Sequence, residues 1–220
     1  IITLAILGNY VDAVQRHEPR IQPFDALQDP SSAHYFGTDN LGRDSWARVL
    51  QGTWVSLRVA LGVQLIVLTV GLTVGGLAAI GGRTIDNIVM RVTDIAYAFP
   101  DLLFIILMRS VLEGRDWPVV KDPIVQMIVA ISVVVWVTIA RLVRGQMLSL
   151  KERDYVLAAR AMGAPQSRIV IQHMLPNTLG PVVVAIIFGI PLAIFSEAAL
   201  GFIGLSVPPP TASLGKLVFE

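Results

Sequence analysis

The sequence predicts an all-α membrane protein, a helix bundle that crosses a lipid bilayer several times. Hydrophobic residues make up 54% of the chain and charged residues only 15%, against about 25% charged residues in soluble domains. Residues 59–82 contain no charged side chain. At about 1.5 Å per residue, a helix of this length crosses a hydrocarbon core of about 30 Å. Long apolar runs without the alternation typical of barrel strands favour a helix bundle.

Composition and charge exclude several other classes of function. The formal net charge is +1, so no overall positive field attracts nucleic acid. Cysteine is absent, which excludes disulfides, thiolate metal sites and a cysteine nucleophile. His17, His34 and His173 form no metal-ligand pair at helical spacing, so no metal site is predicted. The sequence also lacks a Gly-x-x-x-x-Gly-Lys-Ser/Thr loop, so no P-loop nucleotide site is predicted on this chain.

The N-terminal part is predicted to hold the end of a membrane helix and then a polar loop. Ile1–Val11 is apolar but shorter than the about 20 residues of a span, so we expect the end of a truncated helix. Asp12–Ser56 is polar, and near-helical spacing of apolar residues predicts a short amphipathic helix over Asp44–Gln51. Asp39 or Asn40 is the expected helix cap. A capped surface loop is the simplest interpretation of this pattern alone.

Four complete spans are predicted after this loop. They cover residues 59–82, 85–112, 123–140 and 179–196. With the partial helix they give one partial and four complete spans, and the membrane core extends over residues 57–220. In the first complete span, Gly71, Gly75 and Gly76 predict close packing against another helix, because small residues let helices approach in lipid.

Ionisable residues within the predicted spans are candidates for a pathway. Asp94 and Asp101 share one face with Arg91 if the second span is one helix. Pro100 is expected to bend that helix near its middle. Charged groups at membrane depth face a bundle interior or a water-filled path, and an Arg91–Asp94 pair at the cytoplasmic interface is an equal alternative. Glu197, near the end of the last span, completes this set of pathway or bundle-interior candidates.

Between the third and fourth spans lies an amphipathic, charge-bearing segment, Asp154–Asn177. Asp154 is the expected cap of a first helix, and Gly163 suits the left-handed position that ends it. Pro165 suits the first turn of a second helix, and Pro176 is expected to block its continuation. The segment therefore predicts two short helices joined by a tight turn. Its residues leave two interpretations open: a helix on the lipid surface, or a helix docked in a groove of another protein.

The spacing within this segment resembles a known motif. Ala158, Ala159 and Gly163, followed twelve residues later by Leu175 and Pro176, are similar to the EAA loop of ABC-importer permeases. In that family the loop contacts a cytoplasmic ATPase. The variant YVLAARAMG resembles the dipeptide/oligopeptide/nickel permease branch of binding-protein-dependent transport components.

Two positions depart from the motif. Leu157 stands where the family has glutamate, and His173 stands where it has isoleucine. Leu157 thereby removes an ion pair with the ATPase that the motif implies. Alanines keep one face of the first helix small, and the resemblance implies that this face docks on the ATPase. The coupling contact that it implies comprises seven residues: Tyr155, Ala158, Ala159, Arg160, Gly163, Leu175 and Pro176.

Three further segments resemble the same branch. Residues 36–61, which begin FGTDNLGRD, resemble the stretch before its second helix, and residues 94–103 resemble its third helix. Residues 196–215, SEAALGFIGLSVPPPTASLG, resemble a signature near its C-terminal end. The resemblance covers essentially residues 33–215. Departures from the signature occur at Ala199, Gly201 and Leu214, the last of which removes an aromatic side chain.

The resemblance implies a transmembrane subunit of an ATP-driven importer in the bacterial or archaeal cytoplasmic (inner) membrane. Its implied fold is that of a type I ABC-importer permease, truncated here at both ends. The expected partners are a second similar permease, two cytoplasmic ATPases, an extracytoplasmic solute-binding protein and the lipid bilayer. ATP and Mg²⁺ would bind the ATPases, with no cofactor on this chain. The family topology puts residues 12–56 outside and the coupling loop, residues 144–177, in the cytoplasm.

Two rival classes of function give different expectations. A secondary transporter would use Asp94 and Asp101 as a proton or ion site, and its uptake would survive ATP depletion but not loss of the proton gradient. An intramembrane enzyme is disfavoured, because the spans lack a histidine pair, a cysteine, or a serine with a base partner. Cargo in the family ranges over dipeptides, longer peptides, nickel chelates and some sugars, and its selection lies largely with the binding protein.

Overall fold

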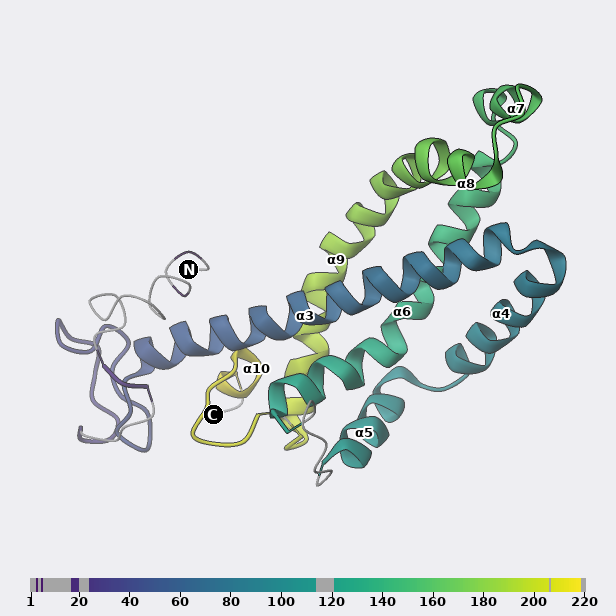
Figure 1. The fold of residues 1–220 in the computed structure, drawn as a ribbon. Coiled ribbons are helices and arrows are strands. Elements are labelled where there is room, and N and C mark those ends of the chain that lie inside the picture. The colour runs from purple at the N-terminus through teal and green to yellow at the C-terminus, as the bar shows by residue number, and fades with distance from the viewer. Residues whose placement is uncertain are drawn as a thin grey trace. The chain divides into compact units, whose positions relative to one another are not determined.

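The computed structural model describes residues 3, 5, 17–19, 24–113, 121–205 and 207–218. Its helices are α3 (Ser45–Ile80), α4 (Gly82–Tyr97), α5 (Asp101–Leu112), α6 (Pro123–Leu150), α7 (Asp154–Ala161), α8 (Gln166–Ile169), the π-helix η2 (Val170–Met174), α9 (Leu175–Phe202) and α10 (Leu214–Leu217) (Figure 1). In these ranges β pairing is limited to an isolated bridge between Thr38 and Asp44. The predicted all-α class is confirmed. The predicted helix tail over residues 1–11 lies outside the described residues except for positions 3 and 5.

Among the described residues, three helices are long and apolar enough to cross a membrane: Ser45–Ile80, Pro123–Leu150 and the continuous run Gln166–Phe202. α4 and α5 pass the same test together but are bent by 89° at a short break, so they give a fourth span only if the bent pair crosses once. The prediction of a multi-spanning helix bundle is thus confirmed. The four complete spans predicted from the sequence match the count obtained when α4 and α5 together are taken as one span.

The first long helix begins earlier than predicted. The expected short helix over Asp44–Gln51 is not a separate element, because α3 runs without interruption from residue 45 to residue 80. Its N-terminal cap is Asp44, whose Oδ1 accepts the backbone N–H of Ala47 at 2.9 Å. The prediction of Asp39 or Asn40 as the cap is therefore wrong. The polar side chains after residue 50 suggested a loop, but buried partners elsewhere in the protein hold them within the helix.

Asp39 instead organises the turn before α3. Its Oδ1 accepts the backbone N–H groups of Leu41 and Arg43, each at 2.9 Å. Its Oδ2 accepts the Nε–H of Arg43 at 2.7 Å and an N–H of Arg48. Burial by itself raises the pKa of Asp39, but the hydrogen bonds and the charge of Arg43 hold this pKa below its ordinary value. The stability that Asp39 contributes is therefore complete above about pH 4 and is lost as the pH falls through the lowered pKa.

The second predicted span is broken rather than bent. α4 ends at Tyr97 and α5 begins at Asp101, with an angle of 89° between them. Pro100 has no N–H to donate, and its ring disfavours the helical conformation at Phe99. The break separates Asp101 from Asp94, so the prediction that both lie on one helix face is wrong. A periodicity argument assumes a straight helix, and the proline removes that assumption.

The helices form two compact units. Unit 1 contains residues 1–62, 108–129 and 191–220, and unit 2 contains residues 63–107 and 130–190. The long helices α3, α6 and α9 each contribute residues to both units.

Within unit 2, α3 and α6 pack closely at two glycines. A Cβ atom on Gly71 would lie 2.5 Å from Cγ2 of Ile139, and a Cβ atom on Gly75 would overlap the carbonyl oxygen of Ala140. The predicted role of these glycines in helix packing is confirmed. Gly76 differs, because the nearest atom to its Cβ would be 3.8 Å away, which is an ordinary contact.

Two ion pairs join α4 to α6 in unit 2. The guanidinium of Arg144 binds both carboxylate oxygens of Asp86, with Nη2 at 2.6 Å from Oδ2. One turn earlier, Nη2 of Arg141 lies 2.8 Å from Oδ1 of Asp94, and its guanidinium carbon lies 4.6 Å from the centre of the Tyr97 ring. The third span was predicted to end near these arginines, whereas α6 continues to residue 150. The two arginines therefore fix α4 against the middle of a longer helix.

The two neighbouring glycines of α3 provide a test of this packing. Gly75→Ala is expected to lower the free energy of unfolding by about 1–3 kcal/mol, because the added methyl group overpacks the α3–α6 contact. The matched control, Gly76→Ala, is expected to be neutral or to stabilise by up to about 1 kcal/mol, because alanine restricts the unfolded chain. Thermal unfolding of the full-length protein in detergent measures both. Equal shifts for the two variants would contradict the close contact at Gly75.

Candidate functional site

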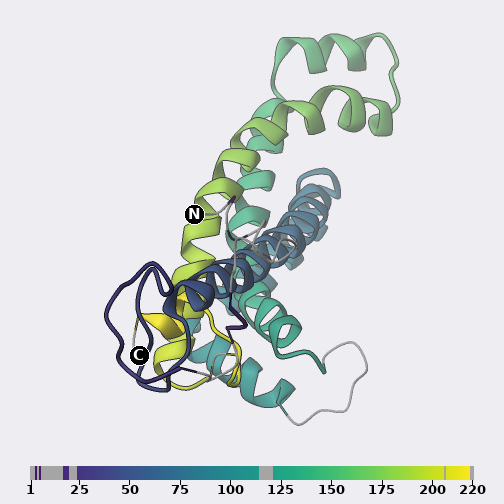
Figure 2. The ribbon, with the colours of Figure 1, turned by 90° about the vertical axis from the view of Figure 1, so that its left-hand side faces the viewer.

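Residues 154–177, called the elbow, connect α6 to α9. They contain α7, a tight turn, α8, the π-helix η2 and the first residues of α9. α7 and α8 lie side by side, joined by the turn (Figure 2). The prediction of two short helices joined by a tight turn is therefore confirmed for this segment.

The start of α7 differs in one detail from the prediction. Asp154 is the first residue of the helix, and the capping position is held by Arg153, whose side chain makes no cap hydrogen bond. The predicted capping role of Asp154 is therefore wrong. Its negative charge still lies in the first turn, where it interacts favourably with the positive end of the helix dipole.

The turn at the end of α7 depends on Gly163. Its φ angle is +81°, in the left-handed region that residues with a Cβ atom rarely adopt. The N–H of Gly163 donates to the carbonyl of Arg160, and the N–H of Ala164 donates to that of Ala159, both at 3.0 Å. This pair of bonds is a Schellman motif, which satisfies the last free carbonyls of the helix. The predicted left-handed role of Gly163 is confirmed.

The second part of the elbow does not end at its proline. Pro165 immediately precedes α8, and the helical path then continues without a gap through η2 into α9. The expectation that Pro176 blocks the helix is therefore wrong. In the π-helix Val170–Met174 the carbonyls bond amides five residues on. This wider turn directly before Pro176 changes the hydrogen-bond register where the proline lacks an amide donor.

The elbow has a buried side and an exposed side. Its buried side chains are Val156, Ala159, Ile169 and Met174. Its exposed large apolar residues include Tyr155 and Leu157 of α7 and Met162, directly after α7, which is 81% exposed.

The seven residues of the implied coupling contact fall on different sides of the elbow. Ala159 is buried and Leu175 half-buried. The other five residues are exposed: Tyr155, Ala158, Arg160, Gly163 and Pro176. Ala158 and Ala159 therefore do not form one small outer face, because only Ala158 faces outward. The departing residue His173 lies on η2, and its ring centre is 6.3 Å from that of Tyr155.

The two aspartates proposed for a pathway lie apart. Asp94, on α4, has 64% of its side chain exposed and pairs with Arg141. Asp101 is an exposed residue at the start of α5, beyond the break at Pro100. The alternative pairing of Asp94 with Arg91 is replaced by the Arg141 pair that the structure shows.

Glu197 lies in the interior of unit 1, where it is fully buried. Ser56 of α3 donates its Oγ–H to Oε2 of Glu197 at 2.9 Å, and the same Oγ accepts the backbone N–H of Leu214 at 3.1 Å. Gln51 accepts the N–H of Ala212 at 3.1 Å. The segment leading into α10 is thus bound to α3 by polar contacts.

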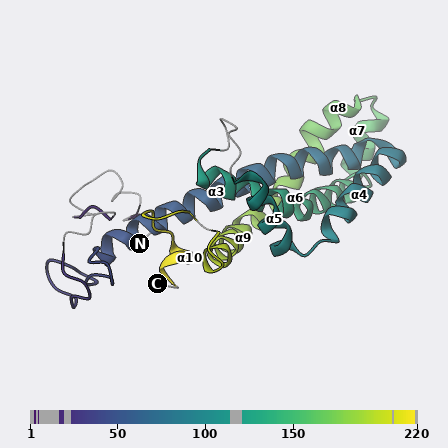
Figure 3. The ribbon, with the colours of Figure 1, turned by 90° about the horizontal axis from the view of Figure 1, so that it is seen from below.

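α10 also packs directly on α9, as the view from below shows (Figure 3). A Cβ atom on Gly215 would overlap the Cα of Ala198 on α9. A Cβ atom on Gly52 of α3 would lie 3.0 Å from both Ser213 and Leu217. Small residues on three elements therefore allow α3, α9 and α10 to approach closely around Glu197.

Unit 1 also holds a cavity of about 510 Å³ with a mixed polar and apolar lining, which the sequence did not predict. Its charged lining residues are Arg109, Glu113 and Lys216. Arg109 is buried and donates from Nη1 to Oε1 of Gln126, which also lines the cavity. Arg109 lies within a predicted span, and this could have indicated the cavity, because charged residues at membrane depth face a bundle interior or a water-filled space.

Comparison with known proteins gives a consistent result. Residues 71–220 match the family described as "Binding-protein-dependent transport system inner membrane component". The chain is 38% identical over 195 residues to the "Oligopeptide transport system permease protein OppC" of Bacillus subtilis (strain 168), covering 89% of this chain and 61% of that protein. It is 42% identical over 188 residues to the "Dipeptide transport system permease protein DppC" of the same organism, covering 86% and 56%. The chain thus spans about three fifths of the length of these relatives.

A solved structure shows the same fold. A chain of the MetNI methionine ABC transporter in an inward-facing conformation superposes with a TM-score of 0.64, covering 77% of each chain. The two sequences are 23% identical. At this level of identity, the likeness shows a shared helix-bundle fold only.

The hydrogen-bonded contact at Glu197 can be tested with a pair of serines. Ser56→Ala removes a hydroxyl that serves both Glu197 and Leu214, and we expect it to lower the free energy of unfolding by about 1–3 kcal/mol. The control is Ser196→Ala, because Ser196 donates to Leu192 of its own helix, and its loss should cost less than about 0.5 kcal/mol. Thermal unfolding in detergent compares them. A loss for Ser56→Ala no larger than that of the control would contradict the contact.

Proposed function

The chain belongs to the family of binding-protein-dependent transport system inner membrane components, and from that membership we propose that it is the membrane-spanning subunit of an ATP-driven importer. It forms half of a translocation path and couples to cytoplasmic ATPases through the elbow. The chain itself hydrolyses nothing and binds no cofactor. ATP and Mg²⁺ bind the partner ATPases.

The observation that carries this proposal is the exposed apolar surface of α7. Tyr155 and Leu157 on this eight-residue helix, and Met162 at its C-terminal cap, are between 42% and 81% exposed, and the helix stands between two membrane helices. Exposed apolar residues on a short helix whose C-terminal end is fixed by the turn at Gly163 fit helix-in-groove recognition by another protein. Leu157, which stands in place of the motif's glutamate, makes this contact apolar rather than ionic.

The proposed assembly contains a second permease subunit, two ATPases and an extracytoplasmic solute-binding protein in a multi-pass inner-membrane complex. The proposed cargo is a peptide or a related small solute, because the relatives at 38% and 42% identity are an oligopeptide and a dipeptide permease. The proposed topology places the elbow in the cytoplasm and the loop before α3 outside.

The proposed mechanism is a two-state movement that the ATPases drive. Closure of the ATPase dimer displaces α7, and the displacement reaches α6 and α9, which leave the elbow at its two ends. These helices tilt as rigid bodies and open the path to the other side. The movement is allosteric, because nucleotide and cargo would bind at distinct sites and would shift the same equilibrium between two arrangements of the helices.

A secondary transporter using Asp94 and Asp101 receives less support. Asp94 is engaged by Arg141 and largely exposed, and Asp101 lies on another helix. A shared ion site needs ligands that converge, and these two carboxylates lie on either side of an 89° break. Uptake that persists after ATP depletion and stops when the proton gradient collapses would favour this rival.

The turn at Gly163 provides the test of the elbow. Gly163→Val forces a β-branched residue into a left-handed conformation that costs about 1–2 kcal/mol, which corresponds to a factor of about 5–30 in the population of the native turn. We expect uptake and recovery of the ATPases with the purified complex to fall together. The space around Gly163 is open, so strain and not a clash causes the effect.

Gly145→Val on α6 is the matched control. Gly145 also has open space around a Cβ atom, but its φ angle is outside the left-handed region. Its uptake and ATPase recovery should remain at the level of the parent protein. Normal uptake and normal assembly for Gly163→Val would rule out the elbow as the coupling element.

A further inference from the structure

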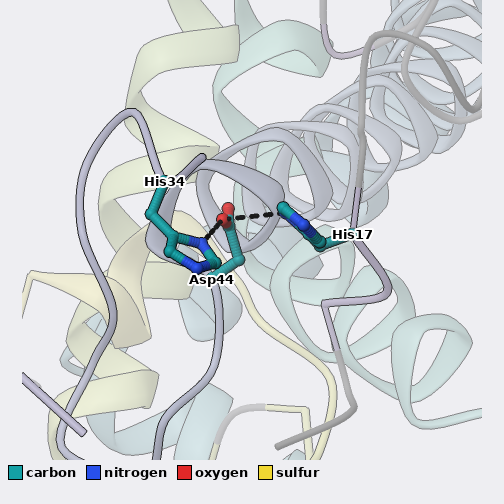
Figure 4. A group of neighbouring side chains, drawn as sticks. All are labelled: His17, His34 and Asp44. Atoms are coloured by element: carbon teal, nitrogen blue, oxygen red, sulfur yellow. Dashed lines mark hydrogen bonds and ion pairs between the residues drawn. The ribbon is translucent and has the colours of Figure 1, made fainter. Parts of the chain in front are cut away.

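A cluster of two histidines and an aspartate lies beside the start of α3. Nδ1 of His34 is 2.7 Å from Oδ2 of Asp44, and Nδ1 of His17 is 3.1 Å from the same oxygen. Both rings turn toward this carboxylate from separate chain segments (Figure 4). One donor atom from each of the three residues can be chosen so that all lie within 4.8 Å of one another.

Burial and ring contacts hold the cluster in place. His34 and Asp44 are 5% and 2% exposed, and His17 is partly exposed. The ring of Phe24 packs edge-on against both imidazoles, with ring centres 4.9 Å from His17 and 4.3 Å from His34. The two imidazoles are 5.0 Å apart. The donor atoms therefore lie close together beside the Phe24 ring, with His17 the most exposed of the three residues.

The charges nearby are distributed so that Asp44 is available to the histidines. Arg43 and Arg48 both bind the carboxylate of Asp39. On Asp44, Oδ1 caps α3 by accepting the N–H of Ala47, and Oδ2 faces the two imidazoles. Two imidazole nitrogens thus converge on one anionic oxygen.

We propose that His17, His34 and Asp44 bind a divalent transition-metal cation, with Zn²⁺ as the best-fitting ion. Imidazole nitrogen and carboxylate oxygen are the ligand types that Zn²⁺ accepts, at about 2.0–2.2 Å. In a tetrahedral site, ligands at these distances are separated by about 3.3 Å. The observed nitrogen–oxygen separations of 2.7 and 3.1 Å would increase by about 0.6 and 0.2 Å, and the two nitrogens, with all three donor atoms within 4.8 Å of one another, would adjust to the same spacing. A fourth position remains on the side of His17 for water or a bound solute.

Metal binding would also change which nitrogen of each imidazole carries the proton. Without a metal, each imidazole must carry its proton on Nδ1 to donate to the shared oxygen. A cation replaces both protons, leaves each ring protonated on Nε2, and is ligated by all three atoms. The ion would join chain positions 17, 34 and 44, and so would fix the polar loop to the first turn of α3.

The spacing of these residues in the sequence does not indicate a metal site. Helical spacing between histidines is the usual sequence signal of such a site, and without it no metal site is predicted. His17 and His34 lie outside the helices, 17 positions apart, and neither has a nearby cysteine or second histidine. The proposed site is independent of the elbow and of the function proposed for it.

The experiment uses the full-length protein in lipid nanodiscs, purified without a polyhistidine tag and stripped with a chelator. Co²⁺ is titrated and followed by its visible ligand-field absorption, and Zn²⁺ is then added to displace it. His17→Gln and His34→Gln remove one imidazole each. Asp44→Asn removes the charge but keeps the helix cap, since asparagine caps as well as aspartate. The matched control is His173→Gln, because His173 is the third histidine of the chain and lies on η2.

The parent protein and His173→Gln are expected to bind one Co²⁺ that Zn²⁺ displaces. The three site variants should bind at least about tenfold more weakly, since even outer partners of metal ligands contribute about 10–100-fold to affinity. Unfolding temperatures measured without metal show whether each variant folds, and His17→Gln is the most tolerant because its ring is partly exposed. Zn²⁺ should raise the unfolding temperature of the parent and control only. Absence of Co²⁺ absorption in the parent, or equal affinity in the folded site variants, would overturn the proposal.

Discussion

The need of each backbone amide and carbonyl for a partner shapes this protein at every point where a helix stops. A bilayer supplies no water to such groups, so breaks within membrane helices must be satisfied by the protein itself. At the end of α4, the N–H of Ala98 bonds the carbonyls of Asp94 and Ile95. Helix ends outside the candidate spans meet the same need, as at the end of α7, where the Schellman bonds around Gly163 satisfy the last carbonyls. At α10, Ser213 caps the helix and Ser56 accepts the N–H of Leu214.

This requirement explains which parts of the fold the sequence predicts. Uncharged runs identify the spans, because charge is costly in lipid. Gly163 identifies the turn, because few other residues adopt its φ angle. Helix boundaries are less predictable. Pro176 indicated a stop, yet the π-helix before it lets the helical path continue, and Asp39 or Asn40 was the predicted cap, yet Asp44 caps α3.

The candidate sites are less predictable still, because their partners are remote in sequence. Ser56 and Glu197 are 141 positions apart, and Arg144 and Asp86 are 58 apart. Glu197 could be selected as an acid in a predicted span, but its serine partner carries no signal of its own. For Asp94 and Asp101 the sequence predicted a proximity that does not exist. Their spacing would place them on one face of a straight helix, but the break at Pro100 separates them. Local periodicity thus predicts which residues share a helix face, whereas contacts between residues remote in sequence become visible only in the folded structure.

The two ends of the elbow differ in how firmly they are attached to their membrane helices. Toward α9 the backbone is helical without a gap, from α8 through η2. Toward α6 the link is a turn over residues 151–153, closed by backbone bonds of 3.1–3.4 Å. Lys151 adds a bond from its Nζ to the carbonyl of Ala79, at the end of α3. A continuous helix transmits a displacement as a rigid rod, whereas a turn absorbs part of it in a few dihedral angles. Within unit 2, α7 is thus joined by a turn at each end, at residues 151–153 toward α6 and at Gly163 toward α8, whereas a displacement of α8 reaches α9 through a continuous helical path in which the π-helix is the place that can yield.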